Sequence, residues 1–141
     1  MDRNLIFLPA LIQVFLTLGL YIYLARVKSE AVKLGQVNEA RRALYDDAWP
    51  ETVLQVNNCI RNQFEVPVLF YALIFIIWSV DAVSIYIQIL AWLFALSRIL
   101  HALIHTGSNY VPSRRKVFSF GCLLLTALAL FAGSSILLAQ A

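Results

Sequence analysis

The chain has 141 residues, of which 61% are hydrophobic and only 13% are charged, and its formal net charge is +3. A soluble domain of this size could not bury that much apolar side-chain surface, whereas a lipid bilayer can cover it, so we expect an integral membrane protein. The basic residues gather in two loops without interleaved aromatic side chains, a pattern that excludes the usual nucleic-acid-binding surface.

The first predicted span covers residues 5–27. Its apolar run continues through Tyr21 to Tyr23 and ends at Arg26 and Lys28, whereas a cleaved signal peptide has a shorter apolar region and a cleavage site of small residues. We interpret it as a retained transmembrane helix. The following residues 28–50 are polar and carry both signs of charge, which fits either a partly amphipathic interfacial helix or a solvated linker.

The second predicted span covers residues 53–80, but its uninterrupted apolar part begins only at Val66. A helix of this apolar length reaches about 22 Å, which is short of a hydrocarbon core of about 30 Å. The missing length must come from the preceding turns, which draws Arg61, Asn62 and Glu65 toward the membrane. We expect Pro67 to kink this helix one turn after Glu65.

The third and fourth predicted spans cover residues 85–105 and 115–139. The apolar stretch of the third span is also short, so Arg98 and His101 are expected within the depth of the bilayer. A polar loop with glycine and proline separates the two spans, and Arg114 and Arg115 open the fourth.

The orientation follows from the basic loops. By the positive-inside rule, loops 28–50 and 106–116 face the cytoplasm and both termini lie on the opposite side. The short polar termini carry no retention signal, so we expect a bacterial inner membrane.

Two polar stripes lie at the cytoplasmic end of the second and third spans. Arg61 and Glu65 are spaced for an i,i+4 ion pair, and Arg98, His101 and His105 share one helix face. The stripes are expected to face each other or a neighbouring subunit. A purely structural polar network between helices would give the same spacing.

Cations outnumber acids in this region. Glu65 is the only acidic residue within the predicted spans, and Asp81 lies in the turn between the second and third spans. An excess of guanidinium groups near a helix N-terminus favours a carboxylate or phosphate ligand. Arg114 and Arg115 could instead serve only as a positive-inside anchor. His101 and His105 lack a third ligand and an acidic partner, so no metal site is expected.

Cys59 and Cys122 fall in or near the predicted spans. Two cysteines in this setting give no disulfide framework, and we interpret both as small buried hydrophobic residues.

Three stretches of the chain carry a family pattern: residues 61–71 (RNQFEVPVLFY), 97–101 (SRILH) and 105–115 (HTGSNYVPSRR). Together with the span count and loop lengths, they resemble the MAPEG family, the membrane-associated proteins of eicosanoid and glutathione metabolism. The resemblance implies a single domain over residues 1–141, an all-α integral membrane four-helix bundle assembled as a homotrimer.

The resemblance also implies a binding site for glutathione, as co-substrate, between neighbouring subunits near the cytoplasmic face. Arg114 matches the arginine that holds the thiolate and is the candidate catalytic residue. The candidate glutathione-binding residues are Arg61, Asn62, Glu65, His101, Arg98, His105, Arg115 and Arg26.

The implied function is a glutathione-dependent transferase or peroxidase that acts on lipophilic small molecules with an electrophilic centre. Two departures from the family pattern, Asn58 in place of an arginine and His105 in place of a tyrosine, keep an alternative open. In that alternative the chain is a non-catalytic membrane protein on the same scaffold, an accessory subunit or a lipid-binding module. Arg115, where prostaglandin synthase carries a serine, argues against prostaglandin synthesis.

Overall fold

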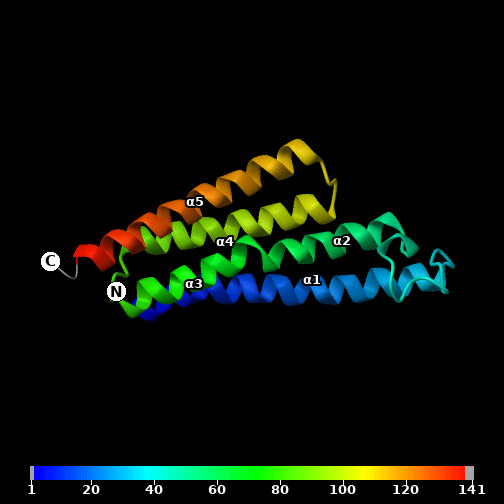
Figure 1. Cartoon of the computed structure of the whole chain (residues 1–141), viewed down its shortest axis with the longest axis horizontal. Helices are drawn as coiled ribbons and strands as arrows, with labels where there is room; N and C mark the ends of the chain where they lie inside the picture. Colours follow the sequence, from blue (N-terminus) through cyan, green and yellow to red (C-terminus); the bar gives the residue numbers. More distant parts are fainter. Residues whose placement is uncertain (1, 139–141) are drawn as a thin grey trace.

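The computed structural model describes residues 2–138, which form an all-helical bundle without strands (Figure 1). In chain order its elements are η1 (Arg3–Ile6), α1 (Phe7–Lys33), η2 (Asp46–Ala48), α2 (Glu51–Arg61), η3 (Asn62–Phe64), α3 (Val66–Ser79), α4 (Ile85–Thr106) and α5 (Val111–Leu138). Four stretches are long and apolar enough to cross a membrane: Arg3–Lys33, Glu51–Ser79, Ile85–Thr106 and Val111–Leu138. The prediction of an all-α protein with four membrane-spanning segments is confirmed.

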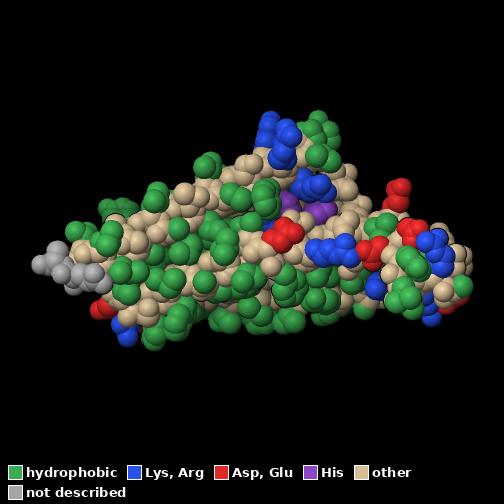
Figure 2. All heavy atoms as spheres, in the orientation of Figure 1, with side chains coloured by type: hydrophobic (Ala, Val, Ile, Leu, Met, Phe, Trp, Pro, Cys, Tyr) green, Lys and Arg blue, Asp and Glu red, His purple; other side chains and the backbone are tan. Residues whose placement is uncertain are grey.

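Apolar side chains cover the outside of the bundle along most of its length, as Figure 2 shows for one face. Phe15, Leu123 and Leu130 are 65%, 68% and 71% exposed. Soluble proteins rarely present continuous apolar surface of this extent, whereas lipid chains solvate it at no cost. The charged side chains gather at the two ends of the bundle and around one hollow on this face (Figure 2). The protein is therefore an integral membrane protein.

The helix bounds differ from the predicted spans at both polar loops. The helix of the first span continues to Lys33, and the rest of the polar connection forms turns and the short helix η2 instead of a separate amphipathic helix. α5 begins at Val111, ahead of the predicted start at residue 115, because Pro112 suits the first turn of a helix. The predicted end of the fourth span at residue 139 lies outside the described residues.

The second span is broken just before Pro67, close to the predicted kink. α2 ends at Arg61, residues 62–64 tighten into η3, and Glu65 leaves the helical conformation with φ −101° and ψ −101°. Pro67 lies in the first turn of α3 and has no N–H to donate to the carbonyl of Gln63. The break places the polar residues of η3 between the amphipathic helix α2 and the apolar helix α3.

Two clusters of buried side chains hold the bundle together. One joins α3, α4 and α5 near the termini, where the rings of Phe70 and Phe94 stack with centroids 4.3 Å apart. The other joins α1, α2 and α4 toward the polar loops, around Leu24, Val56 and Cys59. Both termini lie at one end of the bundle and the two polar loops lie at the other (Figure 1).

α4 packs most extensively against α5, and a small residue permits this contact. A Cβ atom on Gly121 would lie 3.1 Å from Ser97 Oγ, closer than ordinary packing allows. Gly121 thus allows close approach of the two helices, whereas Gly133 has nothing within 4 Å and Ala129 is exposed. The N-terminal part of α5 diverges from α4 toward the polar loops (Figure 1).

Candidate functional site

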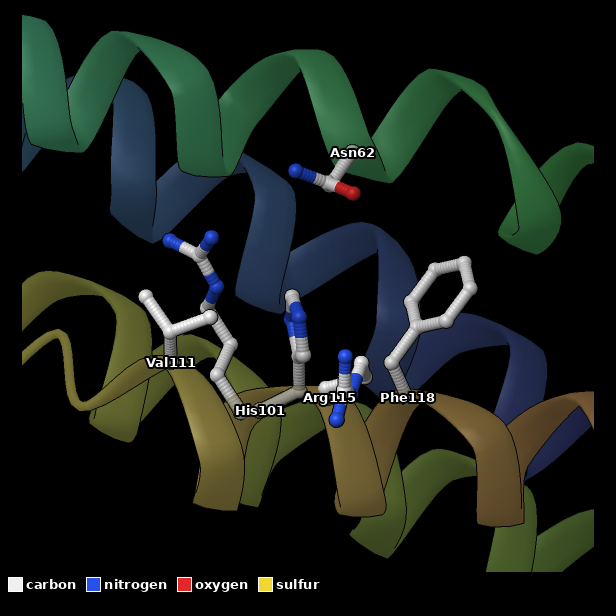
Figure 3. A pocket seen from close by; sticks show the side chains of 6 residues that line it. Asn62, His101, Val111, Arg115 and Phe118 are labelled. Carbon is white, nitrogen blue, oxygen red and sulfur yellow. The ribbon is translucent and has the colours of Figure 1, made fainter.

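A cavity of about 250 Å³ lies between the first turns of α5, helix α4 and the helix break at η3. Its lining comes from three parts of the chain: Asn62, His101, Val111, Arg114, Arg115 and Phe118. Figure 3 shows Asn62 on one wall, opposite His101, Arg115 and Phe118. In Figure 2 the histidine side chains lie at the bottom of a hollow with basic side chains at its edge.

His101 lines the cavity and belongs to the polar stripe of α4, whose other members, Arg98 and His105, lie outside the lining. Arg98, His101 and His105 are 0%, 2% and 4% exposed, so the i, i+3, i+7 spacing places all three on the buried face as predicted. The imidazole rings of His101 and His105 lie edge to face with centroids 5.5 Å apart, and the ring of Phe118 lies 5.8 Å from that of His101. Neither Nδ1 atom has a hydrogen-bond partner among the described residues.

Arg98 lies one turn deeper, behind the cavity lining. Its Nη2 donates to the backbone carbonyl of Asn62 at 3.4 Å, and its guanidinium lies 5.6 Å from the ring centre of Phe118. Its Nε and Nη1 atoms are buried and have no partner within residues 2–138. Arg98 thus ties α4 to the helix break and contributes positive charge to the cavity from behind.

Arg114 reaches the cavity from the first turn of α5. Its Nη1 donates to Oδ1 of Asn109, which has a left-handed backbone with φ 51°, a conformation that asparagine tolerates better than most residues. Arg115 is more exposed and lines the cavity beside it. The loop that holds Arg114 is itself fixed from α2, because Gln55 Nε2 donates to the carbonyls of His105 at 2.7 Å and Gly107 at 2.9 Å.

Five of the predicted site residues are absent from the cavity lining: Arg98 and His105, which are buried on the same face of α4 as His101, and Arg26, Arg61 and Glu65, which lie elsewhere. Arg61 was expected to pair with Glu65, and this is wrong: its Nη2 lies 2.5 Å from Asp46 Oδ2 in the polar loop. Glu65 is exposed and lies outside the lining. Arg26 lies on α1, in a separate groove between Ile22 and Lys33.

The structure also adds residues that the sequence did not single out. Val111 and Phe118 line the cavity because they lie one helical turn on either side of Arg114, and this i−3, i+4 spacing could have identified them. Gln13 and Gln63 are buried at the helix break and bonded to each other. No local pattern could have paired them, since one lies on α1 and the other in η3.

The electrostatic character of the cavity is cationic. Its lining includes two guanidinium groups, an imidazole and an amide, and the described residues that line it include no carboxylate. Arg98 adds a third guanidinium behind the wall. Such a site favours a small anionic guest, because guanidinium groups bind carboxylates and thiolates and the apolar surroundings screen them little.

Comparison with known proteins agrees with this picture. A model of the MAPEG family matches residues 6–134, nearly the whole chain. No curated protein and no solved structure matches the chain. The match spans all four membrane helices and every residue of the cavity lining, and the chain belongs to the MAPEG family of membrane proteins, which act in eicosanoid and glutathione metabolism.

Proposed function

We propose that the protein is a glutathione-dependent transferase or peroxidase that acts on lipophilic electrophiles from the bilayer. The observation that carries this proposal is the cavity at the loop end, which gathers Arg114, Arg115 and His101 without a lining carboxylate. Glutathione carries two carboxylates and an ionisable thiol, so it matches the surplus of positive charge.

In this proposal Arg114 is the catalytic residue. Its guanidinium, oriented by Asn109, stabilises the thiolate of bound glutathione over the thiol and so raises the concentration of the nucleophile at neutral pH. Asn62, His101 and Arg115 contact the peptide part of glutathione from the cavity lining. Arg98 and His105 shape the floor behind them.

The proposed chemistry takes two forms. In the transferase reaction the thiolate sulfur forms a bond to an electrophilic carbon, and the leaving group departs with its bonding electrons. In the peroxidase reaction the thiolate sulfur attacks the terminal oxygen of a hydroperoxide, the O–O bond breaks, and the rest of the hydroperoxide leaves as an alcohol. The sulfur becomes a sulfenic acid, which a second glutathione converts to a disulfide and water. Both need an apolar second substrate close to a polar, cationic cavity.

We also propose that the working unit is a homotrimer with the site between subunits. A cavity of about 250 Å³ is smaller than most pockets that enclose a ligand of this class, which run from roughly 300 to 1,000 Å³. Arg26, Arg61 and Glu65 lie outside the cavity of their own protomer. A neighbouring copy would enlarge the pocket and give Arg26 a route to it.

A thermal-shift titration with glutathione in detergent tests the function. Saturable binding must raise the melting temperature. When glutathione exceeds its dissociation constant a hundredfold, binding adds about 2.7 kcal/mol to the free energy of unfolding. Arg114→Ala should weaken binding by roughly 10- to 100-fold, since a hydrogen bond to a charged group contributes about 1.5–3 kcal/mol. It should also abolish the ultraviolet absorbance of the bound thiolate.

Arg41→Ala is the matched control, because Arg41 pairs with Asp47 in the polar loop, far from the cavity lining. It should bind glutathione as the unchanged protein does. Absence of saturable glutathione binding to the unchanged protein would rule the proposal out. Binding without turnover of any lipophilic electrophile or hydroperoxide would favour the non-catalytic alternative.

A further inference from the structure

A buried hydrogen bond between two glutamines joins α1 to the helix break. Gln13 is 0% exposed and Gln63 is 2% exposed, and Gln13 Nε2 donates to Gln63 Oε1 at 2.6 Å. Gln63 Nε2 in turn donates to the carbonyl of Cys59 at 3.1 Å. Neither glutamine lines the cavity.

This hydrogen bond lies at the helix break, where the regular backbone hydrogen bonds of the second span are interrupted. Within a bilayer, a break in a helix is tolerated only when neighbouring side chains satisfy the backbone groups that it frees. Here Gln63 donates to the carbonyl of Cys59 in the last turn of α2, and Arg98 donates to the carbonyl of Asn62 at the start of η3. Segment 62–64 is therefore held from α1 through Gln13 and from α4 through Arg98.

The anchoring of Gln63 decides where Asn62 points. A 3₁₀ helix has three residues per turn, so adjacent side chains differ in direction by about 120°. With Gln63 directed into the buried contact with Gln13, Asn62 is turned away from α1 and lines the cavity. Its Nδ2 is further held by the carbonyl of Asn58 at 3.0 Å.

We infer that Gln13 is a positioning residue: through Gln63 it fixes the helix break so that Asn62 faces the glutathione cavity. The inference rests on the proposed function for its ligand. The structural part of the inference is that α1 fixes segment 62–64, and this part does not depend on any ligand.

Gln13→Leu tests the inference, since it keeps side-chain volume and removes the donor. Amide hydrogen exchange of a peptide covering residues 62–66 should become about three- to twentyfold faster, the range expected for loss of one interhelical hydrogen bond in a membrane protein. Glutathione should bind about three- to twentyfold more weakly for the same reason.

Gln88→Leu is the matched control. Gln88 is also a buried glutamine, on α4, but its Nε2 has no hydrogen-bond partner among the described residues. It does not line the cavity. This variant should leave both the exchange of residues 62–66 and the affinity for glutathione unchanged.

The double variant Gln13→Leu/Gln63→Leu separates positioning from the penalty of an unpaired buried amide. The double variant removes the Gln63 Oε1 that Gln13→Leu leaves unpaired, although the Cys59 carbonyl also loses its side-chain donor, so thermal stability should recover in part relative to Gln13→Leu. Affinity for glutathione should stay low, because the link from α1 that turns Asn62 toward the cavity is lost.

Three results would overturn the inference: unchanged exchange in Gln13→Leu, equal effects of Gln88→Leu, or full recovery of affinity in the double variant. If the unchanged protein binds no glutathione, the proposed function fails, and the exchange measurement alone still decides whether Gln13 holds the break.

Discussion

Arg98 shows how a single buried side chain sets the character of the site. It is wholly buried, its Nη2 is bonded only to a carbonyl 3.4 Å away, and two of its nitrogens have no partner in residues 2–138. A guanidinium held in this way costs stability, because burying a charge without full compensation is unfavourable. Its contribution is to the charge of the cavity and to the support of Asn62.

We therefore expect Arg98→Met to separate stability from binding. Methionine fills much of the same volume without a charge, so the melting temperature should stay the same or rise. Glutathione affinity should fall at least about tenfold, because the carbonyl of Asn62 loses its donor and the cavity loses positive charge. Thermal unfolding and glutathione titration in detergent measure the two effects.

Leu100→Met is the control, since Leu100 is half exposed on the outer side of α4. It should change neither quantity. A marked loss of stability in Arg98→Met would contradict the view that this cation is kept for binding.

For single residues, the sequence predicted the polar stripe of α4 but not the hydrogen-bond and ion-pair partners of the polar residues around the site. Arg98, His101 and His105 share a face because their spacing within one helix fixes their direction. Arg61 was assigned a partner four residues away, yet it reaches Asp46 in the polar loop, and the fold of that loop has no local pattern. The bond between Gln13 and Gln63 depends on packing between elements and is equally invisible in the sequence.

The helices themselves follow closely from apolar length and from proline. Four apolar runs predict four spans, and the lack of a donor at Pro67 predicts an interruption before α3. The length of an apolar run does not determine where a helix ends once it enters a polar segment. Thus α1 continues to Lys33 and α5 begins at Val111, where polar residues remain compatible with a helix.

Contact between α4 and α5 depends on the absence of a side chain at Gly121. We expect Gly121→Leu to lower the free energy of unfolding by about 1–3 kcal/mol, the usual range for overpacking, because its Cβ would already press on Ser97 Oγ at 3.1 Å. Thermal unfolding in detergent measures this loss.

Gly133→Leu is the comparison on the same helix, because a Cβ there meets nothing within 4 Å in the protomer. Unfolding of the monomer should be unaffected by that change. Equal destabilisation by both variants would show that the α4–α5 contact is not what makes Gly121 sensitive to substitution.

Most charged side chains lie at the loop end of the molecule, here called the polar end, and the cavity belongs to it; the Arg3–Asp81 ion pair lies at the other end. Two polar loops, the Arg61–Asp46 pair and the cavity all lie there, while both termini and the turn between α3 and α4 lie at the other end (Figure 1). By the positive-inside rule we expect the polar end to face the cytoplasm, where glutathione is abundant in its reduced form.

Ser108 and Ser79 provide a test of this orientation, because both are exposed and lie at opposite ends of the bundle. In a background with Cys59 and Cys122 replaced by alanine, Ser108→Cys should react with a membrane-impermeant maleimide only from the cytoplasmic face. Ser79→Cys should react only from the opposite face. The reverse pattern would place the cavity outside the cytoplasm and deprive it of its proposed co-substrate.

The broken second span has a further consequence for the surrounding lipid. α1 is apolar from Phe7 to Ala25, 19 residues or about 28 Å, whereas α3 contributes 14 residues, about 21 Å, between the break and the turn at Asp81. The hydrophobic belt is therefore uneven: taller along α1 and lower along α3. Acyl chains must compress next to the low side, at a fraction of a kcal/mol per ångström of mismatch. In the proposed homotrimer, contact between copies that covers this low side would relieve the compression, so bilayer thickness would affect how readily the copies associate.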